Sequence, residues 1–304
     1  MPELPEVETT VRGLRKVLIN NIILDIWFDA FSDAKIFRNT IKNKKYFNSF
    51  KKNVIGAKII SVNRRGKNIF IELNNAYTIV IHMKMTGHLM YGKYIFNEKP
   101  KDGWSWSPTD KKSLLNDRYN RHIHLVFSLS NKHELVFSDS RKFGTVEIFK
   151  TKDVEREKIS KIGREPLDDS FSFTDFKAKI IKSQRAIKTT LLDQKIIAGI
   201  GNIYSDEMLF MSHILPFRKA SSLTDFEMKN LFKNMKKVLE NSILLGGDSM
   251  SDYRNIFGEK GGFQNRHLVY LRNGEKCKTK GCKGLIKKQK INGRSSHFCE
   301  ICQK

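Results

Sequence analysis

The chain has 304 residues, enough for two domains with their own cores and a small appended module. It contains 56 Lys and Arg against 32 Asp and Glu, and the net charge of +24 indicates a polyanionic partner, nucleic acid before an anionic membrane surface. No segment approaches the roughly 18 consecutive apolar residues that a membrane-spanning helix needs, so we exclude such a helix and expect a soluble protein.

The chain begins MPELPEVETT, which has no apolar run and is neither a signal peptide nor a membrane anchor. Apolar side chains recur at three- and four-residue steps, at Leu4, Val7, Val11, Leu14 and Leu18. This spacing predicts a helix from residue 5 to about 18. Pro5 suits the first turn, and acidic residues there complement the positive end of the helix dipole. Pro2 and Glu3 therefore lie at the mouth of the helix.

Two explanations fit Pro2 and Glu3 at this position. A proline at position 2 permits removal of Met1, and an α-amine with a pKa of about 8 is partly neutral and nucleophilic at pH 7. An amine that attacks a sugar at C1′ forms an iminium ion, which makes elimination of the 3′-phosphate easy, and a neighbouring carboxylate can transfer protons. An acidic helix start with an ordinary N-terminal proline explains the same residues without any chemistry.

From about residue 22 to 150 the hydrophobic period changes to two. The segments KNIFIEL, YTIVIHM, HIHLVFSL, HELVFSD and TVEIFK are rich in β-branched or aromatic residues and are separated by turn residues. They predict a mostly antiparallel sandwich or barrel. Residues 91–120 interrupt this pattern and are long for a hairpin loop, so we interpret them as an insertion or a mobile functional element in which Trp104 and Trp106 contact DNA or pack.

Basic residues precede two of these strands. They are Arg64, Arg65 and Lys67 in NRRGKNIF, and Arg141 and Lys142, followed by Phe143, in SDSRKFGTVEIF; Met85 lies near another strand end. Methionine, phenylalanine and arginine are suitable wedges for displacing a base from duplex DNA. Each residue taken singly also fits a core position or a solvated surface.

The chain after residue 150 has a different character. Residues 151–170 are highly charged and indicate a linker, and helical patterns follow it. Gly199-Ile200-Gly201 predicts a tight turn, after which Asn202 can cap a helix that begins near Tyr204. Such a turn can bind a phosphate at the helix N-terminus or simply join two packed helices. Thr224 and Glu227 predict a capping box at the start of a further amphipathic helix.

All four cysteines, Cys277, Cys282, Cys299 and Cys302, lie near the end of the chain. The pattern Cys-x4-Cys, sixteen residues, Cys-x2-Cys matches the two ligand knuckles of a four-thiolate zinc site. A terminal cluster of this kind is typical of a reducing cytosol, so we expect a cytoplasmic protein. Four thiolates leave no open coordination position, and the predicted Zn²⁺ is therefore structural. Four free or disulfide-bonded cysteines are the alternative.

Four separated segments, PELPEVET, RRGK, DSRKFG and GIGNIYSDE, followed by the four-cysteine tail, resemble bacterial formamidopyrimidine-DNA glycosylase, or 8-oxoguanine-DNA glycosylase, of the helix-two-turn-helix superfamily. The resemblance spans nearly the whole chain. It implies an α+β multidomain fold, in which the parts are an N-terminal β-sandwich catalytic domain with an N-terminal helix (2–150), a linker (151–170), a helical helix-two-turn-helix DNA-binding domain (171–265) and a β-hairpin zinc finger (266–304).

The resemblance also implies a monomeric, bifunctional enzyme of base excision repair. Such an enzyme flips an oxidised purine (8-oxoguanine or a formamidopyrimidine) out of duplex DNA, hydrolyses its N-glycosyl bond, and acts as a lyase that cuts the backbone at the abasic site by β,δ-elimination. Base flipping costs a few kcal/mol, roughly, and wedge residues offset it by replacing lost stacking.

Matching the motifs residue by residue implies specific roles. Pro2 is the Schiff-base nucleophile and Glu3 the proton donor at the sugar, with Glu6 in support. Lys67 transfers a proton in β-elimination, and Arg294 contacts phosphate and assists δ-elimination. The implied DNA-binding residues are Met85, Arg141 and Phe143, which fill the gap left by the flipped base, and His122, Lys188 and Asn202.

The sequence departs from the family pattern in three places. The first zinc knuckle has four intervening residues where the family usually has two, residues 91–120 are longer than the usual connection, and Ser183 and Ser251 stand where basic residues are common. Two other functions remain open. The endonuclease VIII branch acts on oxidised pyrimidines but usually has Gly where this chain has Leu4, and the intact Pro2, Glu3 and Lys67 argue against a non-catalytic zinc DNA-binding protein.

Overall fold

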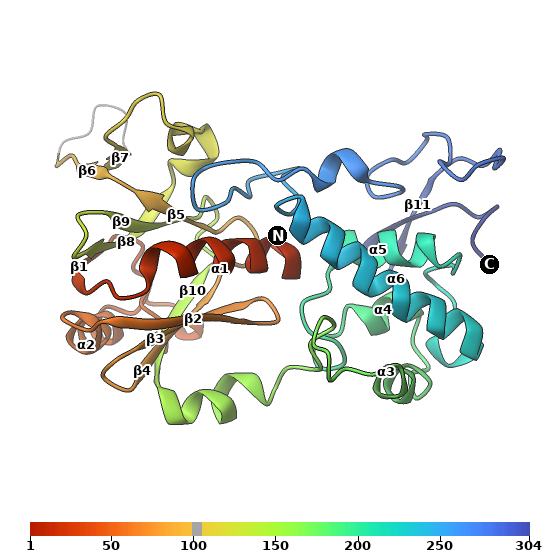
Figure 1. Cartoon of the computed structure of the whole chain (residues 1–304), viewed down its shortest axis with the longest axis horizontal. Coiled ribbons are helices and arrows are strands. Elements are labelled where there is room, and N and C mark those ends of the chain that lie inside the picture. Colours follow the sequence, from red (N-terminus) through yellow and green to blue (C-terminus); the bar gives the residue numbers. More distant parts are fainter. Residues whose placement is uncertain (99–104) are drawn as a thin grey trace. The chain divides into compact units, whose positions relative to one another are not determined.

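The computed structural model describes residues 1–98 and 105–304. The chain forms two compact units (Figure 1). Unit 1 consists of Met1–Ile159 and Gly246–Gly261, and unit 2 of Ser160–Leu245 and Gly262–Lys304. The predicted helical domain, residues 171–265, includes residues 246–261. In the structure this segment belongs to unit 1, so that domain boundary is corrected. The reason is a set of contacts to the N-terminal helix that no local pattern reveals.

Unit 1 is built on two four-stranded antiparallel sheets, as predicted. One sheet has the order β1 (Ile23–Phe28), β8 (Ile123–Leu129), β9 (Glu134–Ser138), β5 (His88–Gly92). The other has the order β10 (Thr145–Lys150), β4 (Tyr77–His82), β3 (Asn68–Leu73), β2 (Ile59–Arg65). Apolar residues that alternate along these strands form the main core of the unit.

The predicted N-terminal helix is confirmed as α1 (Leu4–Leu18). Its stripe of Leu4, Val7, Val11, Leu14 and Leu18 is fully buried. The helix lies between the two sheets in Figure 1, and all but the first of these residues join the same core as the strands. A second helix, α2 (Lys44–Val54), packs against this core through Phe47, Phe50 and Val54, and η1 (Lys35–Phe37) precedes it.

The described part of residues 91–120 contains a short hairpin and two helical turns. These elements are β6 (Tyr94–Phe96), β7 (Trp106–Pro108), η2 (Leu114–Asn116) and η3 (Arg118–Asn120). Trp106 packs against Trp27 and Phe96, with ring centroids 6.0 and 5.3 Å apart. Trp106 thus belongs to an aromatic cluster of unit 1, while Trp104 lies outside the described residues.

Helical turns occupy part of the predicted linker, namely η4 (Thr151–Asp153) and η5 (Glu155–Ile159). Unit 2 then contains α3 (Phe173–Ile180), α4 (Ile187–Leu191), α5 (Asn202–Met211), η6 (Ala220–Ser222), α6 (Asp225–Leu244), η7 (Phe263–Arg266), β11 (Lys287–Ile291) and β12 (Arg294–Phe298). The predicted capping box of Thr224 and Glu227 is confirmed at the start of α6. Among the described residues, no helix has the length and apolarity needed to span a membrane.

Candidate active site and nucleic-acid interface

The first turn of α1 holds two buried carboxylates. Glu3 is the N-cap residue and forms a capping box with Glu6. The N–H of Glu3 donates to Glu6 Oε2 at 2.7 Å, and the N–H of Asp248 donates to Glu6 Oε1 at 2.8 Å. Pro2 is buried, and only 2% of Glu3 and 1% of Glu6 is exposed. The carboxylate of Glu6 therefore fixes the backbone next to Pro2 in one conformation.

Lys67 lies in the turn between β2 and β3, where Gly66 has φ +56° in the left-handed region. Only 7% of Lys67 is exposed. Arg64, in the same turn region, donates from Nε to Glu8 Oε2 at 2.8 Å and from Nη1 to the Gly66 carbonyl at 3.1 Å. Because Glu8 belongs to α1, this ion pair joins the Lys67 turn to the helix that carries Glu3.

The charge of Glu8 strengthens this link. Burial opposes ionisation of the carboxyl group, but hydrogen bonds from Arg12 and Arg64 and the charges of both guanidinium groups outweigh it, so the pKa of Glu8 lies below its usual range. Glu8 is therefore ionised at neutral pH and forms ion pairs with Arg12 and Arg64. Arg64 in turn stabilises the Lys67 turn through its hydrogen bond to the Gly66 carbonyl.

His82 lies beside this turn, because it pairs with Asn68 across β3 and β4. Burial first, and then the positive charges of Lys84 and Lys67, lower the pKa of His82 to about 3. The ring is thus neutral at physiological pH. The neighbourhood of Lys67 carries cationic groups, which suits the approach of a phosphate.

The three predicted wedge residues lie on two loops of unit 1 and are exposed. The exposed fraction is 39% for Met85 and 46% for Phe143, and Arg141 is also exposed. The Arg141 guanidinium lies over the Phe143 ring, 4.6 Å from its centroid. Exposed apolar and guanidinium groups that stack on one another are what an intercalating wedge needs.

Asp139, which sequence reasoning missed, joins these two loops. Its buried carboxylate accepts from the hydroxyl of Thr86, next to Met85, and from the N–H of Gly144 at 2.7 Å. The N–H of Asp139 donates to the His122 carbonyl at 2.8 Å. Burial first, and then the charge of a neighbouring histidine, place the pKa of His122 below its usual range. The acidic residue two positions before Arg141 in DSRKFG was the available signal.

In unit 2 the predicted glycine turn precedes α5. Gly199 has φ +82°, and its N–H donates to Gln194 Oε1 at 2.8 Å, while Gln194 Nε2 donates to the Ile200 carbonyl at 2.8 Å. The helix starts at Asn202 with Gly201 as its N-cap, so the prediction that Asn202 caps the helix is wrong. Within the described residues, the buried Oδ1 of Asn202 has no hydrogen-bond partner.

Lys188 does not lie on a surface that DNA could reach. Its side chain is fully buried, and Nζ donates to Asp206 Oδ1 and to the Ser295 carbonyl, both at 2.6 Å. Asp206 also accepts from Ser296 Oγ at 2.9 Å and from the His297 N–H at 3.0 Å. A buried ammonium cannot contact a phosphate, so the direct DNA contact predicted for Lys188 does not fit the structure. Lys188 and Asp206 instead fasten β12 to α4 and α5.

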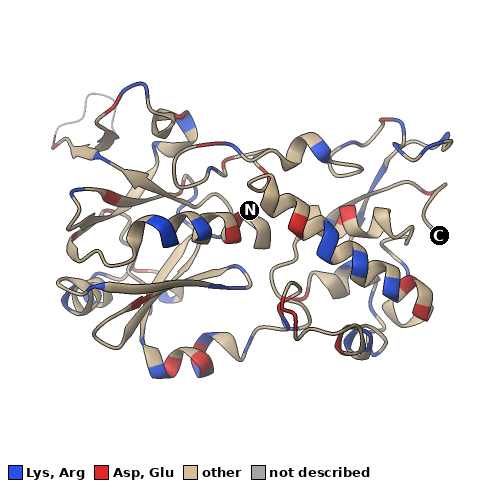
Figure 2. Cartoon of the chain, viewed as in Figure 1, with Lys and Arg blue, Asp and Glu red and all other residues tan. Residues whose placement is uncertain are grey.

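Arg294 is the first residue of β12 and is exposed. It follows the hairpin turn of Asn292 and Gly293, whose φ values of +46° and +78° are those of a tight two-residue turn. Figure 2 shows lysine and arginine along α6 and β11 of the same unit. Unit 2 therefore displays basic side chains on elements that its core fixes.

The four cysteines lie together, with all sulfur atoms within 4.8 Å of one another. The Sγ atoms of Cys277 and Cys302 are 3.3 Å apart, and those of Cys282 and Cys299 are 3.7 Å apart. Four thiolates around one zinc ion would have sulfur atoms about 3.8 Å apart, given Zn–S bonds of about 2.3 Å. The cluster thus fits a tetrahedral metal site.

Backbone N–H groups donate hydrogen bonds to two of the cysteine sulfur atoms, as is usual around thiolate metal ligands. The N–H of Thr279 donates to Cys277 Sγ and the N–H of Gly284 to Cys282 Sγ, both at 3.4 Å. A Cβ on Gly284 would lie 2.6 Å from Cys299 Sγ, so the position requires glycine. The four-residue spacing of the first knuckle therefore still brings its two sulfur atoms to the cluster.

Comparison with known proteins gives two family matches. Residues 1–146 match the formamidopyrimidine-DNA glycosylase N-terminal domain, and residues 162–254 match the formamidopyrimidine-DNA glycosylase H2TH domain. The formamidopyrimidine-DNA glycosylases of Listeria monocytogenes (serovar 1/2a) and Rickettsia bellii are 36% and 33% identical to this chain, with both chains of each pair fully covered.

Solved structures of Lactococcus lactis Fpg are similar to this chain throughout. A complex of that protein with DNA containing an abasic site has a TM-score of 0.82 at 32% identity and covers 99% of both chains. A complex of the wild-type protein with DNA containing N7-benzyl-Fapy-dG has a TM-score of 0.82 at 32% identity and covers both chains fully.

Proposed function

The chain belongs to the formamidopyrimidine-DNA glycosylase family, and on this premise we propose which of its residues perform the reaction. The protein is a DNA glycosylase of base excision repair that removes oxidised purines from duplex DNA, and it also cleaves the strand at abasic sites. The purine branch of the superfamily is therefore correct, and the endonuclease VIII alternative is not. We further propose that it acts as a monomer in the cytoplasm, on the nucleoid.

Base removal is proposed to begin at Pro2. After removal of Met1, the Pro2 nitrogen forms a bond to C1′ of the sugar while the bond from C1′ to the purine nitrogen breaks. The departing purine takes up a proton from water, and the Pro2 nitrogen loses its remaining N–H proton. Glu3 then donates a proton to the ring oxygen O4′ as the C1′–O4′ bond breaks, and the nitrogen lone pair forms the C1′=N double bond of an iminium ion. The observation that carries this proposal is the buried capping box, which holds Glu3 beside Pro2 through Glu6.

Strand cleavage is proposed to use Lys67 and Arg294. The iminium ion acidifies the C2′ proton, and Lys67 transfers that proton as the C3′–O bond breaks and the 3′-phosphate leaves. Loss of a C4′ proton then forms a C4′=C5′ double bond as the C5′–O bond breaks and the 5′-phosphate leaves, and Arg294 contacts the phosphate during this δ-elimination. The cationic surroundings of Lys67 and the exposed position of Arg294 support these roles.

DNA binding is proposed to use side chains of both units. Met85, Arg141 and Phe143 would fill the gap left by the flipped base, in keeping with their exposure. His122 and Asn202 would contact the DNA backbone. Lys188 is now proposed to act indirectly, by fixing β12, whose first residue is Arg294.

The cysteine cluster is proposed to hold one structural Zn²⁺ through Cys277, Cys282, Cys299 and Cys302. When bound, this ion supplies folding energy to the end of the chain and takes no part in the bond changes. The cluster thereby fixes the end of β12, the strand whose first residue is Arg294.

Borohydride trapping tests the proposal. With a duplex that contains 8-oxoguanine opposite cytosine, the wild-type protein should form a covalent adduct, and intact mass should show that Met1 is absent. The Glu3→Gln variant should lose base removal, whereas Glu240→Gln, which changes an exposed carboxylate on α6, should retain it. Folded wild-type protein that forms no adduct would refute the Schiff-base assignment and would favour a non-catalytic DNA-binding protein. A thymine glycol duplex should be a poorer substrate.

A further inference from the structure

Residues 246–261 contact the catalytic helix α1 at its first turn. The N–H of Asp248 donates to Glu6 Oε1, and the hydroxyl of Tyr253 donates to the Glu6 carbonyl at 3.0 Å. A Cβ on Gly247, which has φ +84°, would lie 2.9 Å from Glu6 Oε1 and 3.3 Å from its Cα. The segment therefore packs backbone to backbone against the residue that fixes Glu3.

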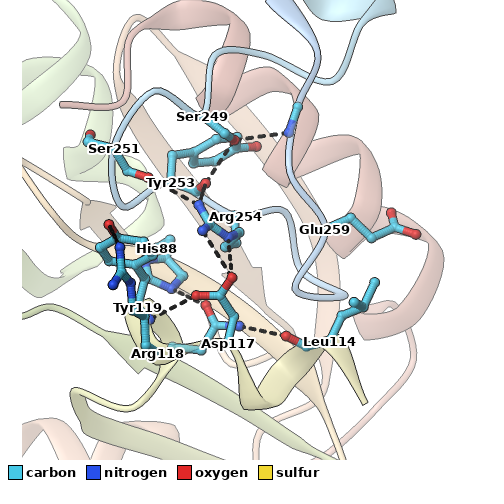
Figure 3. A network of polar contacts seen from close by, with 12 residues as sticks. His88, Leu114, Asp117, Arg118, Tyr119, Ser249, Ser251, Tyr253, Arg254 and Glu259 are labelled. Carbon is cyan, nitrogen blue, oxygen red and sulfur yellow. Dashed lines mark hydrogen bonds and ion pairs between the residues drawn. The ribbon is translucent and has the colours of Figure 1, made fainter. Parts of the chain in front are cut away.

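The same segment is fastened at its centre by a buried arginine. Arg254 is 1% exposed, and its Nε and Nη2 donate to Asp117 Oδ2 at 3.2 and 3.0 Å (Figure 3). Its Nη1 donates to the carbonyls of Ser251 and Tyr253 at 3.1 and 2.8 Å, and its guanidinium lies 4.9 Å from the centre of the Tyr119 ring. All three nitrogens of this guanidinium group thus donate hydrogen bonds, and the group also contacts the Tyr119 ring.

Asp117 belongs to the long 91–120 segment, which is itself fixed to the sandwich. The Asn120 amide donates to the Leu114 carbonyl at 3.1 Å and its Oδ1 lies 2.9 Å from the buried ring of His88, on β5. Gly258 approaches so closely that a Cβ there would lie 2.6 Å from the Leu114 backbone. Residues 113–120, at the end of the long segment, therefore pack against residues 246–261 and stabilise their position.

We propose that the ion pair between the buried Arg254 and the partly exposed Asp117 is a positioning element for base removal. Residues 113–120 hold residues 246–261, which in turn hold Glu6 and, through its carboxylate, Glu3. This inference rests on the proposed role of Glu3 as the proton donor at the sugar. A preformed abasic site has no base to expel, so its cleavage requires less of this proton donor than base removal does.

The test compares two substrates under single-turnover conditions with the full-length protein. Asp117→Asn keeps the shape of the side chain but leaves the Arg254 charge unpaired. We expect base removal from an 8-oxoguanine duplex to fall by about tenfold or more, since small misplacement of a catalytic group is costly. Cleavage of a preformed abasic site should stay within about threefold of wild type. Asp110→Asn, an exposed change in the same segment, should alter neither rate.

A double variant separates positioning from folding. Asp117→Asn combined with Arg254→Gln pairs two neutral amides, and it should recover part of the lost base-removal rate relative to either single variant. Equal loss of both rates with a lowered Tm, or unchanged base removal in Asp117→Asn, overturns the inference. If Asp117→Asn does not fold, the double variant decides by the same two rates. Wild-type protein inactive on both substrates would instead refute the proposed function.

Discussion

The first turn of α1 and the β11–β12 hairpin hold their functional side chains by different means. In α1, the buried carboxylate of Glu6 accepts hydrogen bonds from the backbone N–H groups of Glu3 and Asp248, and it thereby fixes the position of Glu3. In the hairpin, Arg294 is exposed on a strand that is anchored by Asp206 at one point and by the cysteine cluster at its end. A proton donor beside a nucleophile needs a fixed and dry position, whereas a phosphate contact needs an exposed side chain on a rigid support.

Breaking the cysteine cluster should have the largest effect. We expect Cys299→Ser to lose bound metal and to reduce strand cleavage at abasic sites by about 100-fold or more, because a structural zinc site contributes roughly 10 kcal/mol of folding free energy to its module. Metal analysis and a cleavage assay measure this. Glu300→Gln, an exposed change between two of the ligands, is the matched control. A metal-free variant with normal cleavage would contradict the prediction.

Breaking the second anchor of the hairpin should have the next largest effect. Lys188→Met leaves the buried carboxylate of Asp206 without its cation, and removal of one partner from a buried ion pair costs about 3–5 kcal/mol. Urea unfolding of the variant should show a loss of this size in the free energy of unfolding. Lys195→Met, at an exposed position nearby, should show almost none. A loss below about 1 kcal/mol for Lys188→Met would mean that the pair does not hold β12.

The two regions also differ in how far the sequence predicts them. The α1 helix and the capping box of α6 follow from spacings within a few residues, and both are confirmed. Four cysteines likewise meet because their spacing is that of two knuckles. The partners of Glu6 could not be predicted in this way, since Asp248 and Tyr253 follow it by more than 240 residues.

The burial of charged residues could not be predicted from the sequence either. A lysine in a basic chain is expected to face a polyanion, yet Lys188 is fully buried because Asp206 lies one helix away in the sequence and next to it in space. The available signal was the adjacent acidic pair Asp206 and Glu207 within a helix that carries no other charged residue. Glu207 indeed accepts three backbone N–H groups, from residues 268–270.

In unit 1, a smaller effect is expected from the link between α1 and the Lys67 turn. Glu8→Gln removes the charge that holds Arg64, and we expect a loss of about 1–2 kcal/mol at neutral pH, because the pair is only partly buried. The pKa of Glu8 is lowered in the folded state, so wild type gains this stability above the usual glutamate range and loses it as the pH falls through the folded pKa. The variant should therefore approach wild type as the pH falls through the lowered pKa of Glu8, whereas Glu98→Gln, at an exposed position, should leave the free energy of unfolding at neutral pH nearly unchanged.

At neutral pH the smallest effect should come from His82, beside the same turn, because its contribution is felt only as the pH falls below 6.5, approximately. Its pKa is lowered to about 3 in the folded state, while an unfolded chain has a histidine pKa of about 6.5. Between these pH values His82 is protonated in the unfolded chain but neutral in the folded chain. The free energy of unfolding of unit 1 is therefore highest above pH 6.5, approximately, and decreases as the pH falls. The decline has an upper limit of about 1.4 kcal/mol per pH unit from this group. His82→Gln cannot bind that proton, and its free energy of unfolding should depend less steeply on pH between 6.5 and 4, approximately, when both proteins are unfolded with urea. Equal slopes would place a compensating acidic group next to His82, and the cationic surroundings assigned to Lys67 would then be wrong.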